Sequence, residues 1–210
     1  MAIQLPDLRQ TADGWTVDDA SPSLLVELLD ELARCAADAG APLDDVLQPG
    51  LSRQQVLDGL GELGLPAPDE LVAWWGWHNG SRPDLIGGQG LALNSLEYAI
   101  ATYPRDSLGT GEFSWNPAYV TVLGPGSYGV SVSTAANASP PAVRATESGQ
   151  GTEPDRVDNQ AISLCTVVTW WITARRNGWI TWQNFGDYGS WVADIDHYPA
   201  EWRVTGLAHF

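Results

Sequence analysis

The sequence predicts an α+β fold, and two observations lead to this prediction. Apolar residues in the first third of the chain, and again near its end, recur at the three- and four-residue spacing of amphipathic helices. Between these segments, short runs rich in β-branched residues are separated by clusters of Gly, Pro and Asn, which is the pattern of strands and turns. Helices packed against one face of a mainly antiparallel sheet would satisfy both patterns.

Each predicted helix has a recognisable start and stop. Ser and Asn caps precede the apolar patterns, and Gly or Pro follows them. Ser52 with Gln55, and Asn94 with Glu97, have the spacing of capping boxes. The predicted helices cover Ser21–Ala39, Gln54–Gly64, Leu65–Gly80, a segment from Asn94 to just before Pro104, and Ala161–Asn177.

The predicted strands are short and concentrated in the middle and at the end of the chain. Residues 1–20 show no such pattern, and we expect an irregular arm there that is anchored by Trp15. Strands or extended segments are predicted at Leu91–Leu93, Tyr119–Leu123, Tyr128–Thr134, Ala142–Glu147, Trp179–Phe185, Trp191–Ile195 and Trp202–Thr205.

The helix predicted over Leu65–Gly80 carries the densest set of local signals. Prolines stand at its start, where a missing N–H has no cost, and Asp69 and Glu70 place negative charge in the first turn. Asn79-Gly80 ends it with residues that tolerate the left-handed conformation. One apolar face follows from the spacing of Leu71, Trp74, Trp75 and His78.

This segment resembles the signature helix of the SUKH superfamily, also described as the Smi/Knr cell-wall-assembly-regulator family. In that family an acidic helix leads into aromatic-His-Asn-Gly, which here is Trp77-His78-Asn79-Gly80. Pro49-Gly50-Leu51-Ser52, the following helix and Leu65-Pro66 are similar to the family's first helix and its Gly-Leu-Pro link. The likeness runs from about Leu43 to Arg105, is fair through the middle strands and at Ile162–Gly178, and is absent after that.

The resemblance implies a single SUKH-like domain over residues 1–210, with a core over about 20–178 and a Trp-rich C-terminal extension over about 179–210. Domains of this superfamily bind different partners and generally catalyse nothing. Bacterial relatives are commonly immunity proteins, which neutralise polymorphic toxins, many of them nucleases, by stoichiometric binding in the producing cell. The resemblance therefore implies a cognate toxin protein as partner. The alternatives are a regulatory scaffold, as in the fungal relatives, and an intracellular carbohydrate-binding module.

The charge of the chain is strongly acidic. Ten cations, all of them arginine, oppose 26 carboxylates and leave a formal net charge of −16. Such a chain repels phosphates, so we expect no direct nucleic-acid binding. It favours a basic protein partner, because opposite fields raise the rate of association. The other interpretation, that the charge only keeps a Trp-rich protein soluble, stays open at this point.

The sequence also bears on compartment and redox state. No apolar run is long enough to span a membrane, and the N-terminal residues do not form a basic, apolar signal, so we expect a cytoplasmic protein without a membrane partner. Cys35 and Cys165 lie far apart, each in a predicted helix, and we expect buried, reduced thiols.

Motifs that suggest chemistry do not hold together on closer reading. Gly124 to Gly129 matches G-x-G-x-x-G, but strand-forming residues follow where a dinucleotide site needs a helix, so we expect a hairpin turn. Asp194, Asp196 and His197 are close in sequence, but on a strand the His would point away from the two Asp residues. We therefore expect no catalytic residues, no cofactor and no metal.

The eleven tryptophans leave two interpretations open in the C-terminal extension. Trp179, Trp182, Trp191 and Trp202 either attach the extension to the core, or form a protein-binding hot spot or a sugar-stacking surface. The best local combination of carboxylates and aromatic residues predicts the partner-binding surface. Its residues are Asp84, Asp187, Tyr188, Trp191, Asp194 and Asp196.

Overall fold

The computed structural model has the α+β fold that the sequence predicts, with a mixed sheet and a separate two-stranded hairpin. In order along the described chain, its strands are β1 (Leu8–Thr11), β2 (Gly14–Val17), β3 (Tyr119–Leu123), β4 (Gly129–Ser133), β5 (Ala142–Thr146), β6 (Gln160–Ile162), β7 (Ile180–Phe185) and β8 (Tyr188–Ala193). The structure describes residues 2–41, 46–81, 92–107, 118–124, 129–135, 139–146, 160–185, 188–203 and 207.

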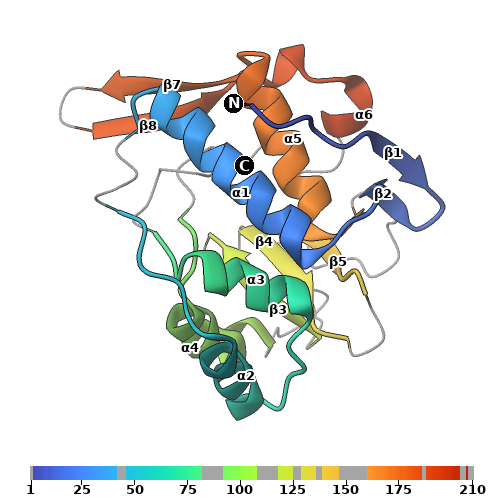
Figure 1. The fold of residues 1–210 in the computed structure, drawn as a ribbon, viewed down its shortest axis with the longest axis vertical. Coiled ribbons are helices and arrows are strands. Elements are labelled where there is room, and N and C mark those ends of the chain that lie inside the picture. Colours follow the sequence, from blue (N-terminus) through green and yellow to red (C-terminus); the bar gives the residue numbers. More distant parts are fainter. Residues whose placement is uncertain are drawn as a thin grey trace.

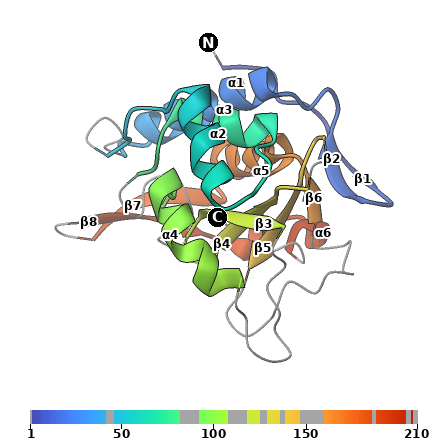
Figure 2. The same cartoon turned by 90° about the horizontal axis from the view of Figure 1, so that it is seen from below.

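The helices in these ranges gather mainly on one side of the sheet. Figure 2 shows α1, α2, α3 and α5 on the same side of strands β3 to β6, with α4 alongside β3. The described helices are α1 (Pro22–Asp38), α2 (Arg53–Glu62), α3 (Asp69–Trp77), α4 (Leu96–Ser107), α5 (Leu164–Arg176) and α6 (Ala200–Arg203), and a 3-10 turn, η2, covers Ile195–His197.

Within the described residues, the large sheet has the order β1-β2-β6-β5-β4-β3. Every neighbouring pair is antiparallel except β2 and β6, which run parallel. The antiparallel pairing of β3 with β4 places Gly124 and Gly129 on either side of a strand-to-strand connection. This confirms the interpretation of the G-x-G-x-x-G match as a hairpin, although residues 125–128 lie outside the described part.

The two faces of the sheet differ in chemistry. The side chains that join the apolar core from β3, β4 and β5 include Val120, Val132 and Val143. The opposite face carries Thr121 and Ser131, whose hydroxyl oxygens lie 3.2 Å apart. All five residues of β3 and all five of β4 are buried, so both faces of these strands are covered.

The local signals at the starts of α1 and α2 act as predicted. The Ser21 hydroxyl accepts from the N–H of Leu24, and Pro22 occupies the first turn of α1. Ser52 and Gln55 form the reciprocal capping box at the start of α2.

The N-terminal segment is not an irregular arm, and that prediction is wrong. Residues 8–17 form the β1–β2 hairpin, which joins the sheet where Trp15 pairs with Ala161 of β6. The sequence carries a signal for this turn in Asp13-Gly14, because Gly adopts the positive φ, here 125°, that a tight hairpin needs. Trp15 is buried, as predicted.

The last long helix begins later than predicted. Ala161 and Ile162 are predicted as the start of the helix, but they belong to strand β6, which pairs with β5 on one side and β2 on the other. Strand pairing overrides helical periodicity here because the sheet needs a central strand at this place. Ser163 turns the chain from strand to helix at a φ of 79° and caps α5 by accepting from the N–H of Cys165.

Glu70 of α3 also caps this helix from a distance. Its carboxylate accepts from the Ser163 hydroxyl at 2.5 Å and from the N–H of Leu164 at 2.7 Å. Burial raises the pKa of the Glu70 carboxyl, and the two hydrogen bonds oppose that change. This contact ties α3 to the start of α5, far away in the sequence.

The signature segment has a structural role in this fold. Trp74 and Trp75 are buried, as predicted, and the indole N–H of Trp75 donates to the carbonyl of Asn94 at 3.0 Å. The helix ends at Trp77 rather than at Asn79-Gly80, because His78 is already extended. The carbonyl oxygen of the Asn79 side chain then accepts from the N–H of Leu96 at the start of α4.

The start of α4 differs from the predicted capping box. Ser95, not Asn94, supplies the cap, because its hydroxyl accepts from the N–H of Tyr98. The Asn94 side chain instead donates to the carbonyls of Thr121 and Gly124. Glu97 accepts from the Asn79 amide at 2.9 Å, so it links α4 to the segment after α3.

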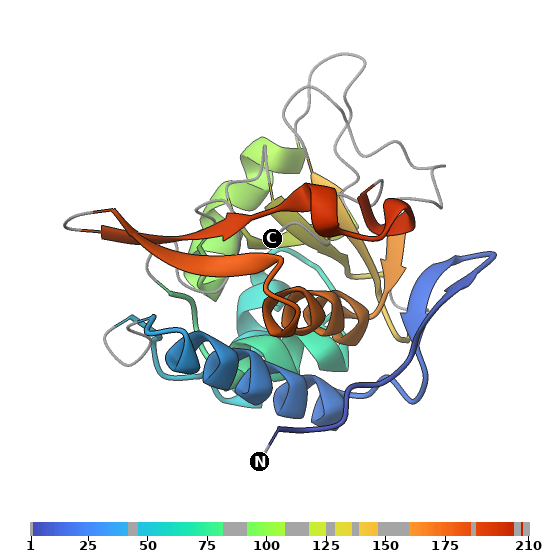
Figure 3. The same ribbon diagram turned by 90° about the horizontal axis from the view of Figure 1, so that it is seen from above.

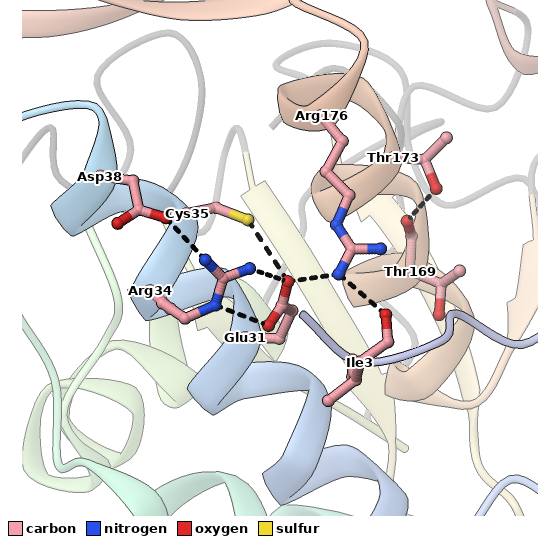
Figure 4. A network of polar contacts seen from close by, with 8 residues as sticks. All are labelled: Ile3, Glu31, Arg34, Cys35, Asp38, Thr169, Thr173 and Arg176. Carbon is pink, nitrogen blue, oxygen red and sulfur yellow. Dashed lines mark hydrogen bonds and ion pairs between the residues drawn. The ribbon is translucent and has the colours of Figure 1, made fainter. Parts of the chain in front are cut away.

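An ion-pair cluster around the buried carboxylate of Glu31 joins α1, α5 and the N-terminal residues (Figure 4). The Glu31 carboxylate, which is almost fully buried, accepts from the guanidinium groups of both Arg34 and Arg176. Arg176 also donates to the carbonyl of Ile3 at 3.0 Å, and Arg34 to Asp38 at 2.6 Å. The hydrogen bond from Arg34 is the largest cause that lowers the pKa of Glu31 to about 2.

The C-terminal tryptophans attach their segment to the core. This is the first of the two interpretations of these residues that the sequence left open. Trp170 of α5 packs against Trp15 at 5.8 Å and against Trp202 at 6.1 Å between ring centroids. Trp202 in turn contacts Trp179 at 5.8 Å. The predicted strand at Trp202–Thr205 is wrong for its first residues, because Trp202 and Arg203 belong to the short helix α6.

Candidate protein-binding surface

The end of β8 forms a turn that is fixed by backbone hydrogen bonds. The N–H of Asp194 donates to the carbonyl of Trp179 at 2.7 Å and so continues the β7–β8 pairing by one residue. The chain then enters η2, where the N–H of His197 donates to Asp194 and that of Tyr198 to Ile195, both at 3.2 Å. Figure 3 shows this turn between the hairpin and α6.

Two buried aromatic side chains pack on the core side of the turn. Trp191 and Tyr198 are each only 2% exposed. The Arg175 guanidinium stacks on the Trp191 ring at 4.6 Å, and Tyr198 packs against Trp179 at 5.6 Å. Burial lowers the pKa of Arg175 to about 10 and raises that of Tyr198. The turn therefore rests on a closely packed base.

Trp191 is therefore a packing residue, which is one of the two interpretations that the sequence left open, and its ring is not at the surface as an anchor for a partner. Its ring faces Trp182 at 5.4 Å between centroids and Arg175 on the side of the core. The physical reason is the alternation of a strand, since Ile180, which pairs with Ala193 on the same face, is buried as well.

The outer side of the turn combines apolar and acidic side chains. Val192 is 37% exposed and Ile195 is 45% exposed. Both are among the three large hydrophobic residues that the structure shows exposed in its described part. Asp194 and Asp196 are exposed on either side of Ile195. We call Val192, Asp194, Ile195 and Asp196 the acidic turn.

The predicted site residues are only partly brought together. Asp194 and Asp196 lie on the surface as expected, whereas Trp191 does not. Asp84 and Asp187 lie outside the described residues, and of Tyr188 the structure describes the backbone, which pairs with Phe185.

The sequence reasoning missed Val192 and Ile195. Once Trp191 is assigned to the core, the pleat alone places Val192 outside. Ile195 was assigned to the strand, but the chain leaves the strand at Asp194 and the 3-10 turn exposes the side chain. The same turn brings His197 Nδ1 to 3.0 Å from the Asp194 carboxylate, although on a strand the two would point apart.

Six arginines whose side chains the structure describes are engaged within the chain. Surface pairs join Arg9 to Asp18 at 2.8 Å and Arg53 to Asp69 at 2.9 Å. Arg144 lies over the Tyr119 ring at 5.2 Å. Arg34 and Arg176 contact the buried Glu31, and Arg175 contacts the Trp191 ring, as given above. Exposed carboxylates in the same ranges outnumber these arginines, so the field outside the protein is negative.

A cleft of about 420 Å³ lies near the starts of α1 and α3 and is a second place where a ligand could be sought. Its lining includes Ser21, Pro68 and Glu70. The Glu70 carboxylate already accepts two hydrogen bonds from the start of α5, and Ser21 already caps α1. These polar groups thus serve helix ends, and Asp69, which also lines the cleft, is paired with Arg53.

No group of three or more His, Cys, Asp or Glu side chains in the described ranges is arranged to hold a metal ion. Cys35 and Cys165 are free thiols; Cys165 is buried as expected, whereas Cys35 is only half-buried. None of the helices that the structure describes has the length and apolar character needed to cross a membrane.

No known protein-family model matches this chain, and no curated protein matches it in sequence. The resemblance to the SUKH superfamily therefore stays a prediction that rests on the residues quoted for it.

Proposed function

We propose that this protein is a non-catalytic cytoplasmic binding protein of the SUKH immunity type. It neutralises a basic toxin made by the same cell by occupying the toxin's surface in a stoichiometric complex. The observation that carries the proposal is the use of charge. Six of the described arginines are engaged within the chain, while carboxylates are left at the surface of a protein with a net charge of −16.

The acidic turn is the part of this surface best suited to bind. Its carboxylates attract a basic surface from a distance, and Val192 and Ile195 supply apolar area that becomes buried on contact. Since backbone hydrogen bonds and buried aromatic rings fix the turn, little conformational freedom is lost when a partner binds.

A sugar-binding role is not part of the proposed function. Sugar-stacking surfaces need exposed aromatic rings, and Trp191 and Trp202 are buried against the core. Their burial weakens the support that the C-terminal tryptophans lent to a carbohydrate-binding module, although Trp179 and Trp182 are only half-buried.

The test is binding of the full chain to the basic protein encoded beside its gene, purified in an inactivated form. We expect a one-to-one complex and an association rate that falls as salt is added. Absence of binding, or a complex whose association rate does not depend on salt, would contradict the proposal.

Variants of the acidic turn locate the interface. Asp194→Asn with Asp196→Asn should slow association at low salt, because two steering charges are lost. The matched control is Asp58→Asn with Glu62→Gln on α2, which makes the same change in net charge at the opposite end of the molecule from β8 (Figure 1). Equal effects of the two pairs would show that net charge alone matters.

The apolar residues should act on dissociation instead. We expect Ile195→Ala with Val192→Ala to dissociate about tenfold faster, since contacts made only in the complex act mainly on the off-rate. Unchanged dissociation would place the interface elsewhere on the acidic surface.

A further inference from the structure

The β7–β8 hairpin carries no charged residue in its strands, although the chain has 26 carboxylates. Each strand is six residues long and contains no proline, and every described strand of the large sheet is shorter. Natural proteins usually protect exposed strand edges by charge, proline, bulges or short length, because unpaired N–H and C=O groups invite another strand.

The large sheet shows such protection at both of its edges. At one edge, β1 is four residues long and carries Arg9, which is paired with Asp18. At the other edge, β3 makes a bridge through Leu123 to Leu93 and packs against α4. Among the sheets of the described part, the hairpin alone lacks these devices.

The register shows which backbone groups of the hairpin point outward. The hydrogen bond from Asp194 to Trp179 makes these two residues a hydrogen-bonded pair. Hydrogen-bonded and non-hydrogen-bonded pairs alternate along an antiparallel ladder. Trp182 and Asn184, opposite Trp191 and Gly189, therefore belong to non-hydrogen-bonded pairs, and their N–H and C=O groups point away from β8.

The outer edge of β7 is the accessible one. Trp191 would present the central groups of the β8 edge, but the whole residue is 2% exposed. On β7, Asn184 is exposed and Trp182 is half-buried, and the flanking Thr181 and Gln183 are exposed as well. No strand within the described residues pairs with this edge of β7.

We propose that the outer edge of β7, around Trp182–Asn184, binds an extended segment of the basic partner as an added β-strand. This inference rests on the proposed function and specifies how the partner docks. Main-chain hydrogen bonds supply the contact in this mode of recognition. The neutral side chains of Thr181 and Gln183 on the exposed face leave such a segment free of local charge repulsion.

The occupant is the basic partner rather than a second copy of the chain. Two copies would bring together two bodies that each carry a net charge of −16. Repulsion between them opposes edge-to-edge pairing, whereas a basic protein is attracted.

The test compares Asn184→Pro with Asn184→Ala in the full chain. Proline removes the outward N–H of residue 184 without removing a bond between β7 and β8, and alanine keeps that N–H. The probe is the inactivated basic protein encoded beside the gene. We expect binding to weaken about tenfold or more with proline, and to change less than about twofold with alanine.

A second measurement needs no variant and so does not depend on how proline affects folding. Hydrogen exchange of the Trp182 and Asn184 amides in the parent chain should slow when the probe binds. If the parent binds but neither the proline variant nor these amides respond, strand addition is wrong and the proposed function stands. If the parent does not bind, the proposed function itself fails. A dimer of the parent alone that Asn184→Pro abolishes would make a second copy the occupant.

Discussion

Glu31 lies inside the molecule and still carries its charge, because two guanidinium groups surround its carboxylate. Replacing it by Gln removes the negative charge that pairs with both Arg34 and Arg176. We expect Glu31→Gln to lower the free energy of unfolding at pH 7 by roughly 2 kcal/mol, since breaking a buried pair costs more than a surface pair is worth. The control is Glu27→Gln at an exposed position one turn earlier on α1, which should change the free energy of unfolding by less than about 0.5 kcal/mol.

The same pair of variants should show a defined pH dependence. The pKa of Glu31 falls from 4.5 to about 2 on folding, so its contribution to stability is complete above about pH 4.5 and is lost as the pH falls toward 2. Urea unfolding at pH 7 and at pH 3 should therefore give a smaller difference between parent and Glu31→Gln at the lower pH. A difference that stays constant between these pH values would contradict the lowered pKa.

Trp75 is the second residue whose loss we expect to be severe. Trp75→Ala removes a fully buried ring and its hydrogen bond to Asn94, at a cost of about 3–5 kcal/mol. Trp77→Ala on the same helix, where the ring is only half-buried, should cost clearly less. Thermal melting of both variants measures this, and equal loss in the two would show that burial is not the cause.

Single residues were predictable where one local rule decides their environment. The spacing of Trp74 and Trp75 on a helix face is enough to place them in the core. Trp191 was misplaced because a tryptophan beside carboxylates fits either a core or a hot spot, and only the pairing of β7 with β8 separates the two.

At the scale of elements, two glycines of α2 make a matched pair. A Cβ at Gly59 would lie 2.7 Å from Leu96 Cδ2 of α4, whereas a Cβ at Gly61 meets nothing within 4 Å. We expect Gly61→Ala to stabilise the protein by about 0.5–1 kcal/mol through helix propensity. Gly59→Ala should lose that gain, because the packed side chains of Leu96 and Ile100 on α4 have to shift. Equal melting temperatures of the two variants would show that the close approach of α2 and α4 does not restrict the side chain at residue 59.

The bounds of an element could be predicted where local sequence signals set them. They could not be predicted where pairing with distant strands sets them. The bounds of α1 and α2 follow from Ser21 and Ser52 to within a residue or two. Strand β6 carries helical periodicity, and its place between β2 and β5 exists only in the folded sheet. The β1–β2 hairpin had a signal in Asp13-Gly14, but with so few apolar residues around it the segment did not show as a pair of strands.

At the scale of the whole molecule, the excess of carboxylates should weaken the folded state at low ionic strength. A net charge of −16 repels itself, and salt screens that repulsion over about 10 Å at 0.1 M. We expect the melting temperature to rise by a few degrees between about 10 mM and 500 mM NaCl. A melting temperature that falls over this range would show that the ion pairs, such as Glu31 with Arg176, outweigh the repulsion.

The fold class and the acidic character of the surface were accessible from composition and periodicity alone. The acidic turn was half accessible, since its carboxylates were predicted and its exposed apolar residues were not. Ile195 becomes visible only when the chain leaves the strand at Asp194, which depends on the contact of that residue with Trp179.

The N-terminal segments find their partners in residues that are made late. Trp15 pairs with Ala161, Ile3 accepts from Arg176, and α1 packs along α5. During synthesis, the apolar stripe of α1 therefore stays without its main partner while more than about 120 further residues are added, which takes roughly ten seconds. Part of the apolar surface of α1 therefore stays exposed in the nascent chain until α5 leaves the ribosome. We expect chaperone contacts to concentrate on α1 in that interval.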